Sequence, residues 1–122
     1  MNPRRGEIWM LDFSPDHAGS EQRGFRPGII IQCDEGNLAP GARTTILVPL
    51  TTRGRPFVFY IPIPAGPATG LQAASWANCT QVFTVDKSRL KARLGSAPAP
   101  ALEAVGRALA ATLDLGGHGE RT

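Results

Sequence analysis

The chain has 122 residues, of which 42% are hydrophobic and 19% charged, and its formal net charge is +3. This length and composition exclude a disordered chain and a long multidomain protein, and they predict one globular domain over residues 1–122. The mild basic bias is compatible with a nucleic-acid partner without requiring one. No stretch resembles a signal peptide or approaches the about 20 apolar residues of a membrane span, so we expect a cytoplasmic protein with no membrane partner.

The first half of the chain predicts three strands. Residues Glu7–Asp12 are apolar and strand-like, and residues 28–33 (GIIIQC) form the continuous β-branched run that is typical of a buried strand. Residues 34–43 are rich in Gly, Pro, Asn and acidic side chains, which predicts a loop. Residues 44–52 predict the next strand, in which Pro49 indicates a sheet edge or a bulge.

The second half of the chain predicts further strands and then a helix. Residues 57–64 alternate in polarity and predict a strand, and residues 74–85 predict one more strand or a bent pair. Asp86 is a suitable cap for one short helical turn. In residues 101–115 apolar side chains recur at spacings of three and four, which predicts an amphipathic helix that Gly116–Gly117 ends. This order favours a small, strongly bent antiparallel sheet or partly open barrel, capped by helix.

The cysteines and histidines give no metal-binding pattern. Cys33 and Cys79 are the only cysteines, and His17 and His118 are the only histidines. A zinc site needs these residue types at characteristic spacings, which are missing here. We therefore expect no metal, no cofactor, and two reduced, semi-buried thiols of the kind found in intracellular proteins.

Residues 19–32 (GSEQRGFRPGIIIQ) place several polar side chains directly ahead of a buried strand. Gly24 permits a tight turn, and Arg26 precedes Pro27, which favours extended backbone at Arg26. A guanidinium held at a strand entrance is suited to bidentate binding of phosphate. From these residues alone two interpretations stay open: a solvated loop with an internal ion pair, or a binding site.

Five segments occur in this order along the chain: RRGEIWMLDFSP, GSEQRGFRPGIIIQ, TTILVPLTT, GLQAAS and TVDKSRL. With them the chain resembles the MazF/PemK family of toxin endoribonucleases from bacterial toxin–antitoxin pairs, from about Arg4 to Leu115. The resemblance implies an SH3-like small barrel with short helices, a homodimer, and metal-independent, sequence-specific cleavage of single-stranded RNA. It also implies an antitoxin partner. The resemblance implies that this antitoxin is MazE-like, and because a basic groove attracts acidic segments, we expect it to be acidic.

The resemblance implies catalytic roles for Arg26 and Thr51, which match the family's catalytic arginine and threonine. In metal-free cleavage the 2′-OH of the RNA attacks the adjacent phosphorus, and the enzyme orients the attack and stabilises the added charge. Arg26 supplies a cation and Thr51 a hydroxyl donor. Because an arginine stays protonated, Glu21 in the same loop is the available base. Which of Arg26 and Glu21 takes the proton stays open, and we expect His17 to be an exposed loop residue.

RNA-binding roles fall on the loop and on one later position. Ser20 and Gln81 match family positions that support RNA binding. Gln22 adds a side-chain amide that can bind phosphate or base edges, and Arg23 adds a cation for the backbone. Trp9 lies in a strand-like run, and we expect it in the core rather than stacked on a base.

Two other functions stay open at this level. Toxins of the same barrel fold can act by poisoning gyrase, and a barrel of this size can bind RNA or a peptide without catalysis. The pairing of Arg26 with Thr51 favours RNA cleavage, because a protein-binding poison needs no such pair.

Overall fold

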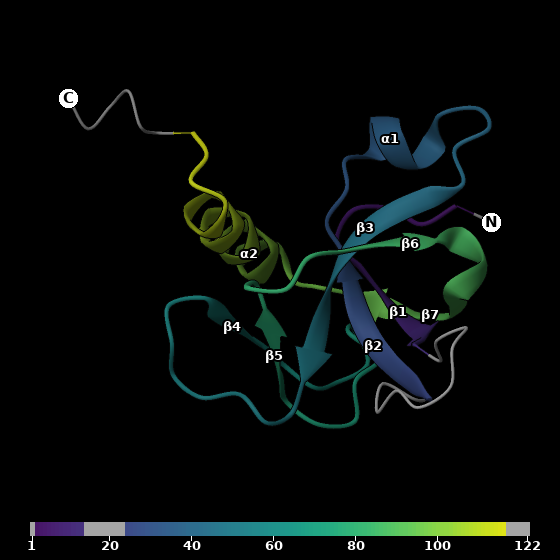
Figure 1. The fold of residues 1–122 in the computed structure, drawn as a ribbon. Helices are drawn as coiled ribbons and strands as arrows, with labels where there is room; N and C mark the ends of the chain where they lie inside the picture. The colour runs from purple at the N-terminus through teal and green to yellow at the C-terminus, as the bar shows by residue number, and fades with distance from the viewer. Residues whose placement is uncertain (1, 14–23, 117–122) are drawn as a thin grey trace.

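The computed structural model describes residues 2–13 and 24–116 as a strongly bent antiparallel sheet with a long helix packed against it (Figure 1). This confirms the predicted fold class, a mainly β protein with a C-terminal helix. The strands are β1 (Glu7–Asp12), β2 (Phe25–Ile30), β3 (Thr44–Thr51), β4 (Tyr60–Ile63), β5 (Ser75–Asn78), β6 (Phe83–Asp86) and β7 (Leu90–Ser96). The helices are α1 (Asp34–Leu38), the 3₁₀ turn η1 (Lys87–Arg89) and α2 (Ala99–Thr112).

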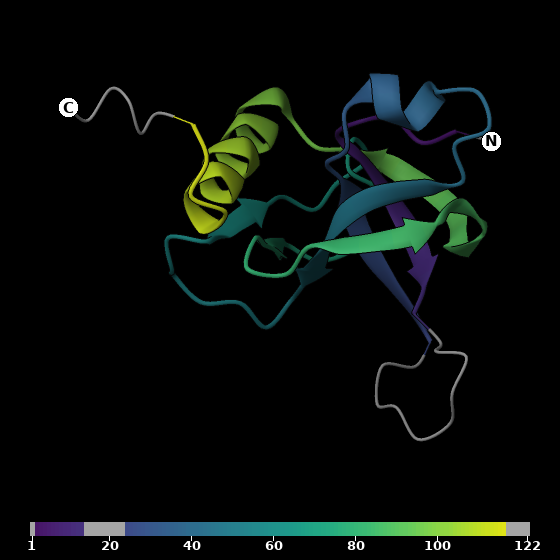
Figure 2. The ribbon, with the colours of Figure 1, turned by 45° about the horizontal axis from the view of Figure 1, so that its top comes forward.

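Strand β3 connects the two parts of the sheet. The strands follow the order β4-β5-β3-β2-β1-β7, and β6 also pairs with β3. Residues 44–47 of β3 pair with β6, whereas residues 50–51 pair with β5. Figure 2 shows β6 running alongside the first part of β3. Because β3 changes partner along its length, the described sheet bends strongly, but β4 and β7 stay at its two ends and it does not close.

The alternation of side chains along the strands gives each face of the sheet its own core. One face packs against α2, which contributes Val105, Ala108 and Leu109 to a cluster with Ile8, Ile29, Val48 and Leu50. The opposite face carries a smaller cluster of Trp9, Leu11, Ile30, Leu47 and Leu90. Trp9 is only 4% exposed, which confirms its predicted place in the core.

Pro49 does not mark the edge of the sheet, since β3 lies inside it. The residue pairs with Gly28 of β2, and on its other side it lies between Leu47, the last β3 residue paired with β6, and Leu50, the first paired with β5. A proline is tolerated at this gap because β3 has a paired neighbour there only on the β2 side.

Helix α1 replaces part of the loop predicted for residues 34–43. The buried side chain of Asn37 holds it. The amide nitrogen of Asn37 donates to the carbonyl of Gln32 at 3.0 Å, and its oxygen accepts from the Thr45 hydroxyl at 2.7 Å. Asp34 accepts a hydrogen bond from the backbone N–H of Arg5 at 2.8 Å, which lowers the pKa of its carboxyl. Tertiary hydrogen bonds of this kind cannot be read from a five-residue sequence pattern.

Strand β7 is the second element that the sequence pattern missed. As predicted, Asp86 caps a short turn, its carboxylate accepting from the Ser88 N–H at 2.8 Å. The chain then continues as a strand rather than a helix. Lys91, Arg93 and Gly95 are weak strand formers, but β7 pairs along β1, with two irregularities in the register. Backbone pairing with β1 therefore outweighs local preference.

Helix α2 begins and ends earlier than the predicted 101–115. It spans Ala99–Thr112, and Asp114 adopts a φ of 58° directly beyond it. The helix therefore ends before Gly116–Gly117, the predicted stop. Leu113 and Leu115, which fit the helical spacing, lie outside the helix and are exposed.

The other boundaries follow the predictions more closely. The predicted strand 57–64 shortens to β4, and residues 74–85 form the bent pair, β5 and β6.

The thiols are not both semi-buried, since Cys33 is exposed and Cys79 is buried. Burial raises the pKa of the Cys79 thiol to about 11. No helix in the described residues is long and apolar enough to cross a membrane.

Candidate active site

The register of β2 and β3 brings Arg26 and Thr51 together. Ile30 pairs with Leu47 and Gly28 with Pro49, so the residue number falls along β2 by as much as it rises along β3. Continuing this antiparallel register beyond Gly28 and Pro49 sets Arg26 opposite Thr51. Opposite residues of antiparallel strands project from the same face of the sheet. The two side chains accordingly line one pocket of about 480 Å³, which we call the arginine pocket.

The arginine pocket is cationic in its described lining. Arg53 contributes a second guanidinium beside Arg26, and no described residue of the lining is acidic. Pro27, Leu50, Thr52 and Ser75 complete the lining of the pocket. Sequence reasoning missed Arg53, Thr52 and Ser75. The segment TTRGR at the end of the strand was the available indication for Arg53, whereas nothing in the local sequence indicates that Ser75 of β5 lines the same pocket as Arg26.

Arg26 is held at the start of β2 as the sequence predicts. Gly24 adopts a φ of 78°, and the chain is extended from Phe25 onward. Arg26 is exposed, and no other described residue gives its side chain a hydrogen bond or an ion pair. Its charge is therefore available, within the described part of the chain, to an anion in the pocket.

Thr51 has a defined orientation. Its Oγ1 accepts a hydrogen bond from the backbone N–H of Arg53 at 3.1 Å. The hydroxyl hydrogen is not used in that bond, so it can be donated to an oxygen in the pocket. On the other side of the strand, Thr51 pairs in register with Trp76 of β5. The half-buried threonine is thus fixed by two neighbouring elements.

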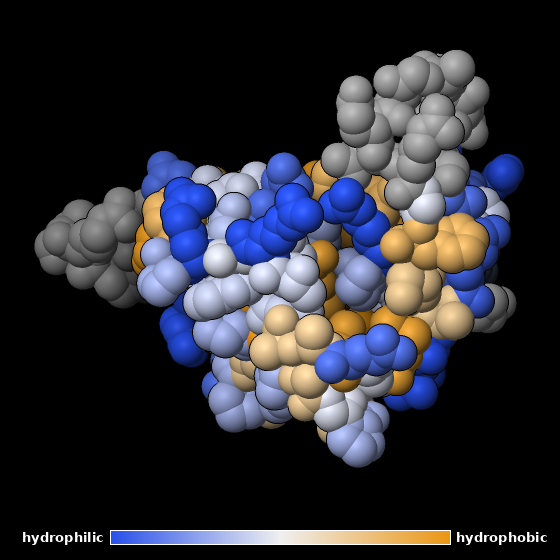
Figure 3. All heavy atoms as spheres, turned by 90° about the horizontal axis from the view of Figure 1, so that it is seen from below, coloured by the Kyte–Doolittle hydropathy of each residue, from blue (hydrophilic) through white to orange (hydrophobic). Residues whose placement is uncertain are grey.

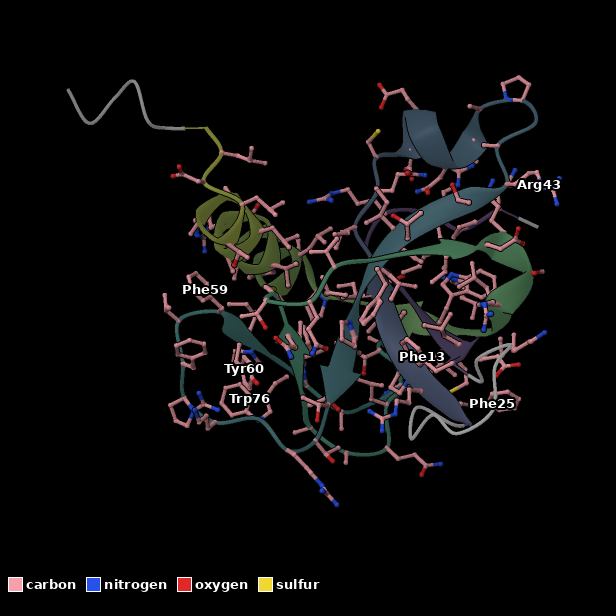
Figure 4. All side chains as sticks on the ribbon, viewed as in Figure 1. Phe13, Phe25, Arg43, Phe59, Tyr60 and Trp76 are labelled. Atoms are coloured by element: carbon pink, nitrogen blue, oxygen red, sulfur yellow. The ribbon has the colours of Figure 1, made fainter. Side chains whose placement is uncertain are left out.

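Gln81 shares a second pocket with Arg26. The two residues line this pocket, of about 140 Å³, together with Phe13, Pro49 and Phe83, and we call it the phenylalanine pocket. The rings of Phe13 and Phe83 meet edge to face, with centroids 5.7 Å apart. Aromatic walls beside a cation are typical of single-stranded nucleic-acid sites. Figure 4 labels Phe13 at this part of the sheet.

The structure therefore brings together three of the predicted site residues, Arg26, Thr51 and Gln81. The remaining four, Ser20, Glu21, Gln22 and Arg23, lie outside the described residues, as does His17. Figure 3 shows the end of the molecule where β3 finishes, a hollowed surface with hydrophilic and hydrophobic side chains around the hollow. Among the described residues there is no cluster of three or more side chains able to hold a metal ion.

The chain matches a known protein family over most of its length. The family model described as PemK-like, MazF-like toxin of type II toxin–antitoxin system matches residues 4–113. The chain is 32% identical over 116 residues to Endoribonuclease MazF9 of Mycobacterium tuberculosis, covering 92% of this chain and 97% of that protein. It is 38% identical over 94 residues to Endoribonuclease MazF of Staphylococcus saprophyticus, covering 75% and 74%.

Solved structures have the same architecture. MazF from Deinococcus radiodurans superposes with a TM-score of 0.75 at 27% identity and covers 94% of this chain and 99% of that chain. An endoribonuclease from a mycobacterial species, solved in complex with its cognate antitoxin, gives a TM-score of 0.73 at 24% identity, with 93% and 96% covered. The second likeness concerns the fold alone.

Proposed function

The chain belongs to the PemK-like, MazF-like toxins of type II toxin–antitoxin systems, and on that premise we propose that Arg26 and Thr51 are the catalytic pair of its endoribonuclease site. The observation that carries this assignment is the β2–β3 register, which puts a guanidinium and a hydroxyl into one cationic pocket. RNA cleavage needs charge stabilisation at the phosphate that is attacked, and the arginine pocket offers it.

The proposed reaction uses the RNA's own 2′-OH as nucleophile. The 2′-oxygen bonds to phosphorus, the bond from phosphorus to the 5′-oxygen breaks, and the products are a 2′,3′-cyclic phosphate and a free 5′-OH. Arg26 stabilises the charge on the phosphoryl oxygens, and the Thr51 hydroxyl donates to one of them. Because a guanidinium stays protonated at neutral pH, it cannot accept the 2′-OH proton. We assign that proton to Glu21, and the leaving 5′-oxygen takes one from solvent or from the protonated base.

The RNA follows the row of pockets around Arg26. Arg53 supplies a second cation for the backbone, and Gln81 lies beside the aromatic walls of the phenylalanine pocket. The loop residues Ser20, Gln22 and Arg23 add polar groups from the segment that precedes β2. This arrangement combines a cationic track with apolar surfaces for bases, which is the usual design of single-strand binding.

We propose two protein partners and a cellular place. An acidic, MazE-like antitoxin covers the cationic site, in keeping with relatives solved in complex with antitoxins. A second copy of the chain forms a homodimer, so light scattering should give about twice the chain mass of 13.0 kDa. The toxin acts in the cytoplasm, where its mRNA substrate is found.

The test is cleavage of a long RNA by the purified protein in EDTA. We expect discrete cuts with 5′-OH ends, and sequencing those ends gives the recognition site. Inhibition of DNA supercoiling without RNA cuts would identify a gyrase poison instead. Binding of RNA without either activity would leave a non-catalytic binding protein.

A further inference from the structure

A third cavity, of about 390 Å³, opens beside the arginine pocket. The two cavities share Pro27, Thr52 and Ser75 in their linings, so a single wall separates them. We call the third cavity the leucine pocket. A ligand group that occupies the arginine pocket is therefore followed directly by space for the next group of the same chain.

The leucine pocket has a different chemistry from its neighbour. Met10, Leu71 and Leu94 give it an apolar floor, and no described residue of its lining is charged. A phosphate meets no cation in the described lining, whereas a flat, neutral, partly apolar group such as a nucleobase suits it. The cationic arginine pocket therefore suits the phosphate backbone of the RNA, whereas the uncharged leucine pocket suits a base.

Gln72 is the polar group best placed to contact that base. Its side chain is exposed at the pocket, and no other described residue forms a hydrogen bond with it. A side-chain amide offers two donors and an acceptor, which can read the edge of a base. No role in the proposed cleavage chemistry falls on this residue.

The segment that presents Gln72 is rigid. The hydroxyl of Thr69, which is 2% exposed, donates to the carbonyl of Pro64 at 2.7 Å and accepts from the N–H of Leu71 at 3.3 Å. Gly70 adopts a φ of 74°, and a Cβ added there would lie 2.1 Å from the carbonyl oxygen of Leu94. The backbone that carries Gln72 is therefore held against β7, so ligand binding needs to order only the Gln72 side chain.

We propose that the leucine pocket binds the base of a nucleotide that adjoins the cleaved phosphate, and that Gln72 determines which base is accepted there. The inference rests on the proposed function, because it requires RNA in the arginine pocket. The base and the phosphate of one nucleotide are joined through a single sugar. Two pockets that share one wall match that connection.

The experiment compares the cleavage preferences of the unmodified protein with those of Gln72→Ala and Gln72→Glu. Each protein cuts the same long RNA, and the new 5′ ends are sequenced. The matched control is Glu35→Ala, which changes an exposed polar residue of α1, at the end of the molecule away from the site (Figure 1).

We expect Gln72→Ala to weaken the base preference at one position next to the cut by about tenfold and to leave the other positions unchanged. Gln72→Glu should redirect that position toward bases with an amino group, because a carboxylate only accepts hydrogen bonds. Glu35→Ala should keep the original preference at every position.

Three results would overturn the inference. One is an unchanged preference in both Gln72 variants, and another is a uniform fall in rate with the preference intact. The third is an unmodified protein that cuts no RNA, which removes the proposed function and the inference together. The first two results leave cleavage in place, so the two failures are distinguishable.

Discussion

Replacing Arg26 with alanine separates a catalytic role from a structural one. The side chain is exposed, no described residue pairs with it, and the β2 backbone at this position pairs with Leu11 regardless of the side chain. We therefore expect the free energy of unfolding to change by no more than about 0.5 kcal/mol. Removal of one preorganised donor from a developing anion typically slows the reaction by about a hundred- to a thousandfold, so the cleavage rate should fall by at least that factor.

The assay is single-turnover cleavage of a short RNA at saturating protein, so that weaker binding does not limit the rate. Arg26→Lys should recover little activity, because an ammonium lacks the planar fork of a guanidinium. Arg107→Ala is the matched control, since Arg107 is an exposed arginine of α2 that lines neither the arginine pocket nor the phenylalanine pocket. An Arg26→Ala protein that cuts RNA at the parental rate would refute the catalytic assignment. A rate loss that follows a large fall in Tm would show a folding role instead.

Thr51→Ala should slow single-turnover cleavage severely, whereas Thr51→Ser should stay close to the parental rate because it keeps the hydroxyl; equal losses would argue against hydroxyl donation. Arg53→Ala should weaken RNA binding and reduce the slope of log affinity against log salt by about 0.7, the value for one lost contact with a single strand, as measured by a binding titration. Glu21→Gln should lower the cleavage rate at unchanged RNA affinity, and near-normal cleavage would remove Glu21 as the base. Burial raises the pKa of Cys79 from its ordinary 9.0 to about 11, so the unfolded chain loses this proton first and denaturant stability should fall as pH rises from about 9 toward 11. In Cys79→Ala this part of the pH dependence should vanish.

The strands of the core could be predicted because their side chains are apolar over a continuous run. Residues 28–33 and 44–52 are rich in β-branched residues, which favour strands. The second prediction nearly matches β3, whereas β2 begins earlier, at Phe25, and ends at Ile30, so the predicted strand is right only over residues 28–30. Helix α1 and strand β7 could not be predicted in the same way. Asn37 stabilises α1 through hydrogen bonds with Gln32 and Thr45, and β7 depends on pairing with β1, which lies more than 70 residues earlier in the chain.

The candidate site likewise combines residues that local sequence identifies with residues that only long-range pairing brings together. Arg26 was identifiable from the sequence because Gly24 permits a tight turn just before it and Pro27 favours extended backbone at Arg26. Its proximity to Thr51 followed from family resemblance, because two residues separated by this much chain have no local pattern in common. Ser75 was missed for the same reason: it reaches the arginine pocket only because β5 pairs with the end of β3.

The position of the site at the end of the β2–β3 pairing has a physical reason. Farther along the two strands, Ile30 and Leu47 are opposite each other and buried in the small core. On the same face, Arg26 and Thr51 lie just beyond Gly28 and Pro49, the last residues at which β2 and β3 pair, and they reach solvent. One pair of strands therefore anchors the site in a packed core and holds a cation and a hydroxyl at its rim. A substitution at Ile30 or Leu47 acts on the rate through stability and geometry, whereas one at Arg26 or Thr51 acts on the reaction directly.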